Sequence, residues 1–196
     1  MLRGCAGAVV RMLPWLVAMG CGNADHALST SVWDLRLPDA EGKEVLLGDL
    51  RGKQGTLLLV LSPDCPMCMN YAGLLAEFPT QGEAVQAIGL FPTEFIPADS
   101  VRAFARRYGI GMPLLMDTDC AVVNALNATV TPEAFLVDAD GRYVYRGAID
   151  DWAVRAGRKK VKATRHYLQD ALAAMRNGEL PEQRAVQAVG CVLECE

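Results

Sequence analysis

The chain has 196 residues, of which 52% are hydrophobic and 21% are charged, and its net charge is −4. A chain of this size can bury a complete core, so one domain with appendages is expected. No apolar run reaches the roughly 20 residues of a membrane-spanning helix, which excludes a polytopic membrane protein, and the abundance of aliphatic residues excludes intrinsic disorder. A mildly acidic chain without a dense basic stripe also argues against nucleic acid as the main partner.

Residues 1–24 have the pattern of an export signal. Two arginines precede a short apolar stretch, small residues follow it, and the segment contains no acidic residue. This pattern is typical of a secretory leader rather than of a membrane span. The stretch that ends at Cys21 resembles a bacterial lipobox, which would leave Cys21 lipidated and attached to the membrane. Residues 22–24 alternatively fit cleavage by a soluble-export peptidase, so we expect a periplasmic or cell-envelope protein, with or without a lipid anchor.

The first half of the remaining chain predicts a hairpin, a buried strand and a helix. Residues 32–37 and 44–47 flank a Gly-containing loop, as in a β-hairpin. Residues 56–62 are a continuous apolar run of strand length, which is expected of a strand covered on both faces. Apolar residues recur at helical spacing over 66–78, and Pro79 ends that helix.

The second half repeats the alternation of strands and helices. The predicted elements are a strand over 84–91, a helix over 101–108 closed by Gly109, a strand over 113–116, a helix over 121–126, a hairpin over 134–138 and 143–146, and a helix over 167–176 with Gly178 as its C-cap. This order predicts an α/β fold with a mixed sheet flanked by helices, an N-terminal β-hairpin and a C-terminal helical extension. We expect one domain over 29–178 and a tail over 179–196.

Seven cysteines are an odd number, which in an exported chain cannot form a purely structural disulfide frame. They are Cys5, Cys21, Cys65, Cys68, Cys120, Cys191 and Cys195.

Cys65-Pro66-Met67-Cys68 carries most of the chemical information. The motif follows the buried strand and opens the next helix, where free N–H groups and the helix dipole favour a thiolate at Cys65. Pro66 suits the first helical turn, and Cys68 lies one turn further on, where it can attack a mixed disulfide at Cys65. A zinc knuckle would need a second pair of ligands, and a disulfide inside the motif would close too short a loop to stabilise the fold much.

With these residues the chain resembles the thioredoxin-fold redoxins, which include the alkyl hydroperoxide reductase/thiol-specific antioxidant group and the exported cytochrome-maturation thioredoxins. The resemblance covers about residues 32–151, and it is carried by residues 50–53, 62–68, 130–132 and 135–141. It implies a thioredoxin fold. In that family a cis-proline faces the cysteine pair, and Pro132 after Thr131 matches it; X-Pro is the bond at which a cis peptide costs little.

The chain departs from the family pattern at its acidic residues. Asp64 stands where thioredoxin-like enzymes usually have an aromatic residue, and residues 56–61 lack the buried acid of thioredoxins. Asp64 or Glu133 could relay a proton instead, but we expect each to be a surface carboxylate.

Three alternatives to disulfide exchange are a thiol peroxidase, a copper-binding chaperone and a non-enzymatic scaffold. A peroxiredoxin-like thiol peroxidase would need an arginine where Pro132 stands, to stabilise charge on the peroxide. A copper-binding chaperone on the same fold could use the thiolates with Met67 and Met69, although His166 is the only histidine of the domain and its helix is expected to be remote. A non-enzymatic envelope scaffold would not need the intact cysteine pair.

The remaining cysteines leave several roles open. Cys191 and Cys195 are four residues apart and could lie on one helical turn. As accessory thiols they could resolve an oxidised Cys65, bind a metal or pair with each other. Cys120 is expected to be a small buried residue rather than a nucleophile.

We therefore expect an exported thiol-disulfide oxidoreductase. Cys65 is the predicted attacking thiolate, Cys68 the resolving thiol and Pro132 a residue that shapes the substrate groove. Pro66, Met67 and Thr131 are the predicted substrate-binding residues. No organic cofactor and no metal are expected, and the predicted partners are a protein dithiol or disulfide and an electron donor.

Overall fold

The computed structural model describes residues 27–78, 84–92 and 95–195 of the chain. The predicted leader over 1–24, with Cys5 and Cys21, lies outside the described residues, as does Pro79. Within the described ranges, no helix is both long and apolar enough to cross a membrane.

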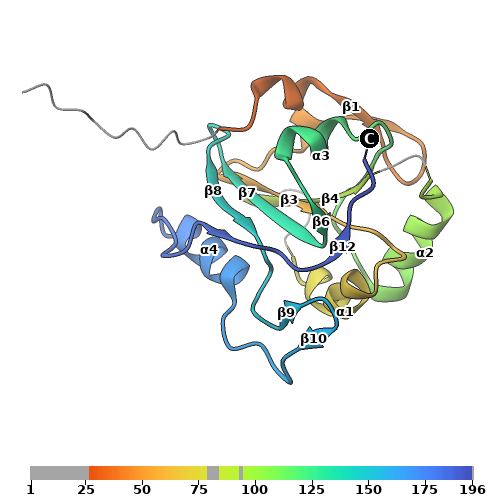
Figure 1. Cartoon of the computed structure of the whole chain (residues 1–196). Coiled ribbons are helices and arrows are strands. Elements are labelled where there is room, and N and C mark those ends of the chain that lie inside the picture. Colours follow the sequence, from red (N-terminus) through yellow and green to blue (C-terminus); the bar gives the residue numbers. More distant parts are fainter. Residues whose placement is uncertain (1–26, 79–83, 93–94, 196) are drawn as a thin grey trace, which may run out of the picture.

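Six strands form a mixed central sheet in the order β11-β8-β7-β3-β4-β5 (Figure 1). They span Ala185–Val186 (β11), Tyr143–Gly147 (β8), Glu133–Asp138 (β7), Gly55–Val60 (β3), Val85–Pro92 (β4) and Leu114–Asp117 (β5). β3, β4 and β5 run parallel, β7 is antiparallel to both β3 and β8, and β11 is parallel to β8. Every residue of β3, β4 and β5 is buried. The thioredoxin-like α/β fold predicted from the sequence is confirmed.

The pleat of β3 divides the core into two clusters. Leu57 and Leu59 point into the first cluster, whereas Leu58 and Val60 point into the second. The first cluster is covered by α1 (Pro66–Leu75), α2 (Ala98–Tyr108) and α4 (Tyr167–Arg176). The second is covered by α3 (Ala121–Leu126) and by two short 3-10 helices, η1 (Thr30–Asp34) and η2 (Leu47–Leu50). A continuous apolar strand is stable here because both of its faces are covered.

The helix ends differ from their predictions by a few residues. α1 ends at Leu75 rather than at residue 78, because Glu77 and Phe78 form tighter turns back to Leu74 and Leu75. α2 begins at Ala98 after Pro97 and has no side-chain cap. Gly109 closes α2 in the left-handed conformation with φ of +69°, as predicted.

The N-terminal hairpin is confirmed but is shorter than predicted. It consists of β1 (Arg36–Pro38) and β2 (Glu44–Leu46). The strand predicted from residue 32 is wrong at its start, because Val32 and Trp33 belong to the 3-10 helix η1. That tight turn buries both side chains in the second cluster at once, which an alternating strand could not do.

The chain after α4 returns across the domain in an extended conformation (Figure 1). β11 adds to the free edge of β8, and β12 (Cys191–Val192) pairs antiparallel with β6 (Val130–Thr131). The sequence predicts neither strand, nor the small hairpin of β9 (Ala153–Arg155) and β10 (Arg158–Lys159). The prediction that Cys191 and Cys195 share a helical turn is wrong, because this segment pairs with β6 instead.

Candidate active site

Cys65 is the N-cap residue of α1, and Pro66 occupies the first helical turn. The backbone N–H of Cys65 donates to the carbonyl oxygen of Ser62 at 3.3 Å, which fixes the turn between β3 and the helix. Cys65 is 3% exposed and Cys68 is fully buried. The motif therefore lies where the sequence predicts it, at the end of the buried strand and the beginning of α1.

The Thr131–Pro132 peptide bond is cis, as predicted. This loop faces Cys65, whose Sγ lies 3.1 Å from the carbonyl oxygen of Thr131. A reduced Cys65 would donate its S–H to that oxygen. Thr131 and Pro132 are both buried, so the contact is shielded from water. The fold thus brings residues 66 positions apart into one site.

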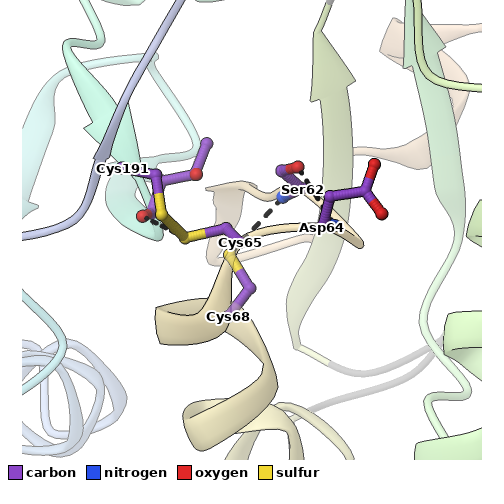
Figure 2. The surroundings of a disulfide bond; sticks show 6 residues. Ser62, Asp64, Cys65, Cys68 and Cys191 are labelled. Atoms are coloured by element: carbon purple, nitrogen blue, oxygen red, sulfur yellow. Dashed lines mark hydrogen bonds between the residues drawn. A yellow bond between two sulfur atoms is a disulfide. The ribbon is translucent and has the colours of Figure 1, made fainter.

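Cys65 forms a disulfide with Cys191 (Figure 2), and the Cα atoms of the two residues are 6.1 Å apart. Cys191 comes from β12, and its backbone is paired in register with Thr131. The sequence raised Cys191 as a thiol that could resolve Cys65, and the structure places it in direct contact with that residue. Cys191 is half-buried, so one side of the disulfide faces the surface.

Cys68 is the one free cysteine of the described residues. Its Sγ accepts the backbone N–H of Ser62 at 3.4 Å. Burial raises the pKa of the Cys68 thiol to about 11, and hydrogen bonds from Ser62 and Thr131 only partly offset this. At neutral pH Cys68 is therefore a protonated thiol held beside the disulfide (Figure 2).

The two acidic residues proposed as proton relays have different environments. Asp64 is exposed, as expected. Glu133 is only 9% exposed, so the expectation of a surface carboxylate is wrong there. Its Oε2 accepts the N–H groups of Thr129, at 2.8 Å, and of Val130, at 3.4 Å. Glu133 is buried because it satisfies the backbone of the turn that leads into β6.

A groove of about 260 Å³ opens beside the disulfide. Its lining includes Asp64, Cys65 and Thr131 from the domain, together with residues 191–194 of the tail. Pro66 is exposed and Met67 is half-buried against the first core cluster, and neither of these two predicted substrate-binding residues is among the lining residues of the groove. A separate cavity of about 610 Å³ lies between the N-terminal hairpin and α2, and no cysteine is among its lining residues.

A second disulfide joins Cys120 to Cys195. Cys120 is 4% exposed, as expected of a small buried residue, but its bond to the tail is not predicted from the sequence. It precedes α3 with φ of 58°, and Asp117 accepts the N–H groups of Val122 and Val123 in the first turn of that helix. No local pattern in the sequence indicates this pairing, because the two cysteines are 75 residues apart.

Of the residues considered for copper, Met67 lies within the motif and packs against the first core cluster. His166 precedes α4, and Met69 is exposed on α1. Among residues 27–78, 84–92 and 95–195, no group of three or more His, Cys, Asp or Glu side chains could hold a metal ion.

The AhpC/TSA family model matches residues 29–146. The thiol-disulfide oxidoreductase ResA of Bacillus subtilis (strain 168) is 30% identical over 112 residues, which are 55% of this chain and 60% of the relative. ResA of Geobacillus kaustophilus (strain HTA426) is 31% identical over 119 residues, or 59% of this chain and 66% of the relative. The chain thus matches less than two thirds of the length of either curated relative.

The fold is similar to the crystal structure of a hypothetical protein from Sinorhizobium meliloti 1021. The TM-score is 0.71 at 28% identity, and the match covers 82% of this chain and 90% of the other. This likeness extends well beyond the 118 residues of the family match, 29–146. Because the family model covers more than half of the sequence, the chain belongs to the AhpC/TSA family.

Proposed function

We propose that this protein is an exported thiol-disulfide oxidoreductase that acts through Cys65 and Cys68. The observation that carries the proposal is the position of Cys65 at the N-terminus of α1, with its sulfur 3.1 Å from the carbonyl oxygen of Thr131 beside the cis-proline. The helix N-terminus favours a thiolate at Cys65 once this residue is reduced. The similarity to ResA proteins, named thiol-disulfide oxidoreductases, supports the same chemistry.

The working cycle has two exchanges. The Cys65 thiolate attacks a disulfide of the target protein, forms a mixed disulfide and expels one target thiolate. Cys68 then attacks Cys65 Sγ, which releases the second target thiol and leaves a Cys65–Cys68 disulfide. An external dithiol returns the pair to its reduced state, and the reverse sequence oxidises a target dithiol. Pro66, Met67 and Thr131 border the attacking sulfur and would contact the target segment.

A peroxidase function has less support. A peroxide-reducing thiolate needs a cation to stabilise the negative charge that develops on the oxygens. No lysine or arginine is among the described residues that line the groove beside Cys65. Pro132 occupies the place where the family pattern has arginine in peroxidases.

The location of the protein is proposed from the leader. Residues 1–24 support export to the periplasm or cell envelope, and the sequence at Cys21 supports attachment by a lipid. Labelling with radioactive palmitate, compared between wild type and Cys21→Ser, tests the anchor.

Mixed-disulfide trapping tests the catalytic assignment. Because Cys191 occupies Cys65 in the structure, the trap is best made in Cys191→Ser protein. In that background, adding Cys68→Ser should accumulate covalent complexes with an oxidised protein substrate. Adding Cys65→Ser instead should give none. Complexes of equal yield through Cys68 alone would contradict the assignment of Cys65 as the nucleophile. Insulin reduction and peroxide consumption, measured side by side, separate the two enzymatic activities.

A further inference from the structure

We propose that Cys191 is a third catalytic cysteine, and that the tail holds the position beside β6 in which a substrate segment would pair, until an exchange of Cys68 with the Cys65–Cys191 bond releases it. This inference rests on the proposed function, because it assigns a regulatory state to the same site. The oxidised protein would then have two isomers. In the closed isomer Cys65 is bonded to Cys191 and the tail is paired with β6; in the open isomer Cys65 is bonded to Cys68 and Cys191 is a free thiol.

Backbone pairing holds the tail beside β6, in addition to the disulfide between Cys191 and Cys65. Cys191 pairs with Thr131 and Val192 with Val130, and the N–H of Leu193 donates to the carbonyl oxygen of Thr129 at 3.0 Å. Antiparallel pairing with a short strand is also how an extended substrate segment would bind next to the cis-proline loop. The tail and a protein substrate would therefore compete for the same hydrogen-bonding groups.

Gly190 shows that this close approach is built into the sequence. A Cβ atom at residue 190 would lie under 3.0 Å from the carbonyl carbon and oxygen of Thr131. Any side chain there would push the tail away from the strand that faces Cys65. Gly190-Cys191 thus combines the residue that permits docking with the residue that bonds to the site.

The tail is also fastened at both sides of Cys191. On the N-terminal side, β11 pairs with β8, and a Cβ at Gly147 would overlap the backbone of Val186. On the C-terminal side, Cys195 is bonded to Cys120. A segment tied at two points stays near the groove after its central bond opens, so its thiol keeps a high effective concentration at Cys65.

The exchange is balanced within the protein. The Cys68 thiolate attacks Cys65 Sγ, a Cys65–Cys68 bond forms, and the Cys65–Cys191 bond breaks. The leaving sulfur of Cys191 takes up the proton that Cys68 gave to solvent. One disulfide and one thiol are present before and after the step, so no oxidant or reductant is required. Cys68 is suited to this role because it is the free cysteine of the described residues and lies one helical turn after Cys65.

Timed alkylation of the oxidised full-length protein tests the inference. In wild type, iodoacetamide should label Cys191 progressively while a Cys65–Cys68 bond accumulates, as read by peptide mass spectrometry under non-reducing conditions. In Cys68→Ala, Cys191 should remain bonded to Cys65 and unlabelled. If wild type labels Cys191 no faster than Cys68→Ala does, the internal exchange is wrong.

Two glycine substitutions test the backbone docking of the tail separately from the disulfide exchange. Gly190→Ala should increase the open isomer relative to wild type by about tenfold, the size of effect expected when one substitution disrupts a docked backbone. Gly73→Ala is the matched control, because a Cβ at residue 73 in α1 would meet nothing within 4 Å. Equal populations of the open isomer in both variants would contradict the inference that the tail takes the place of a substrate segment beside β6. These labelling readouts need no substrate, so they hold even if the protein reduces no target disulfide and the proposed function fails.

Discussion

Two disulfides join the tail of this protein to the domain, and they differ in their surroundings. Cys65–Cys191 lies at a helix N-terminus, beside a groove and next to the free thiol of Cys68. Cys120–Cys195 lies against α3, where Cys120 is buried and the second core cluster packs around it. The bonds are chemically alike, and their neighbours give them different roles. A disulfide that has an attacking thiol within reach can exchange, and one without such a neighbour serves as an anchor.

Removing the attacking sulfur should have the largest effect. Cys65→Ser should lower insulin-reductase activity to the uncatalysed background, because no other described residue offers a thiol at a helix N-terminus facing the cis-proline loop. Cys120→Ser, which breaks only the Cys120–Cys195 bond, should not lower the activity. A Cys65→Ser protein that is as active as the Cys120→Ser protein would show that the catalytic sulfur lies elsewhere.

The two disulfides should be reduced at different rates, because Cys65–Cys191 lies beside a groove and a free thiol. With limiting dithiothreitol, Cys65–Cys191 should open at least about tenfold faster than Cys120–Cys195. Each bond joins a buried cysteine to a half-buried one, but the first bond lines a groove and can exchange with the thiol of Cys68. Quenched samples analysed by peptide mapping give both rates. Simultaneous loss of the two bonds would remove the distinction between an exchanging bond and an anchor.

Loss of the anchor should appear mainly in stability. The bond closes a loop of 75 residues, for which chain entropy predicts a stabilisation of about 4 kcal/mol. The double variant Cys120→Ser/Cys195→Ser should lose much of this free energy of unfolding in a guanidinium titration. Its activity on insulin should rise, because a looser tail leaves the groove more readily. A fall in activity at unchanged stability would contradict an anchoring role.

The free thiol should make stability depend on alkaline pH. The pKa of Cys68 rises from an ordinary value of 9.0 to about 11 because burial penalises the thiolate. The folded state therefore holds this proton longer than the unfolded state does. The stabilisation is complete below pH 9 and is lost between about pH 9 and 11, a change of up to roughly 3 kcal/mol. Urea titrations of wild type should show this slope, and Cys68→Ala should lack it relative to wild type.

Substitution of two buried carboxylates should have the smallest effect on the free energy of unfolding. Glu133 holds the turn before β6, whereas Asp117 holds the first turn of α3 after Cys120. Glu133→Gln and Asp117→Asn should each cost about 1–2 kcal/mol, since each weakens hydrogen bonds to backbone N–H groups. Only Glu133→Gln should also change the labelling rate of Cys191. Equal labelling in both variants would show that the turn does not control the docking of the tail.

The sequence predicts the sheet and the cysteine motif well, because local signals specify them. The apolar run over 56–62 has the length and composition of a strand covered on both faces, and Pro66 directly after Cys65 marks a helix start. The pairing of the tail is not local. Cys191 and Cys195 lie four residues apart, a spacing that fits a helical turn, yet each is bonded to a cysteine 126 or 75 residues away. Only the folded domain brings those sulfurs together.

The sequence mispredicts the burial of Glu133 and the conformation of η1 for a related reason. A glutamate after a proline has no sequence signal for burial, and its burial depends on hydrogen bonds from the N–H groups of Thr129 and Val130, which only the folded chain brings to it. Val32 and Trp33 read as strand residues because apolar, β-prone residues are common in strands. Packing against the second core cluster favours the tighter 3-10 turn instead.

Strand β11 also protects the outer edge of the central sheet. The N–H groups of Arg146 and Ala148 donate to Arg184 and Val186 of the tail at 3.0 Å each. Proteolytic trimming after α4 would leave this row of backbone groups bare, and a bare strand edge invites pairing with another molecule. The tail that is bonded to Cys65 therefore also protects the protein against aggregation. A shortened form would lose solubility together with the Cys65–Cys191 disulfide.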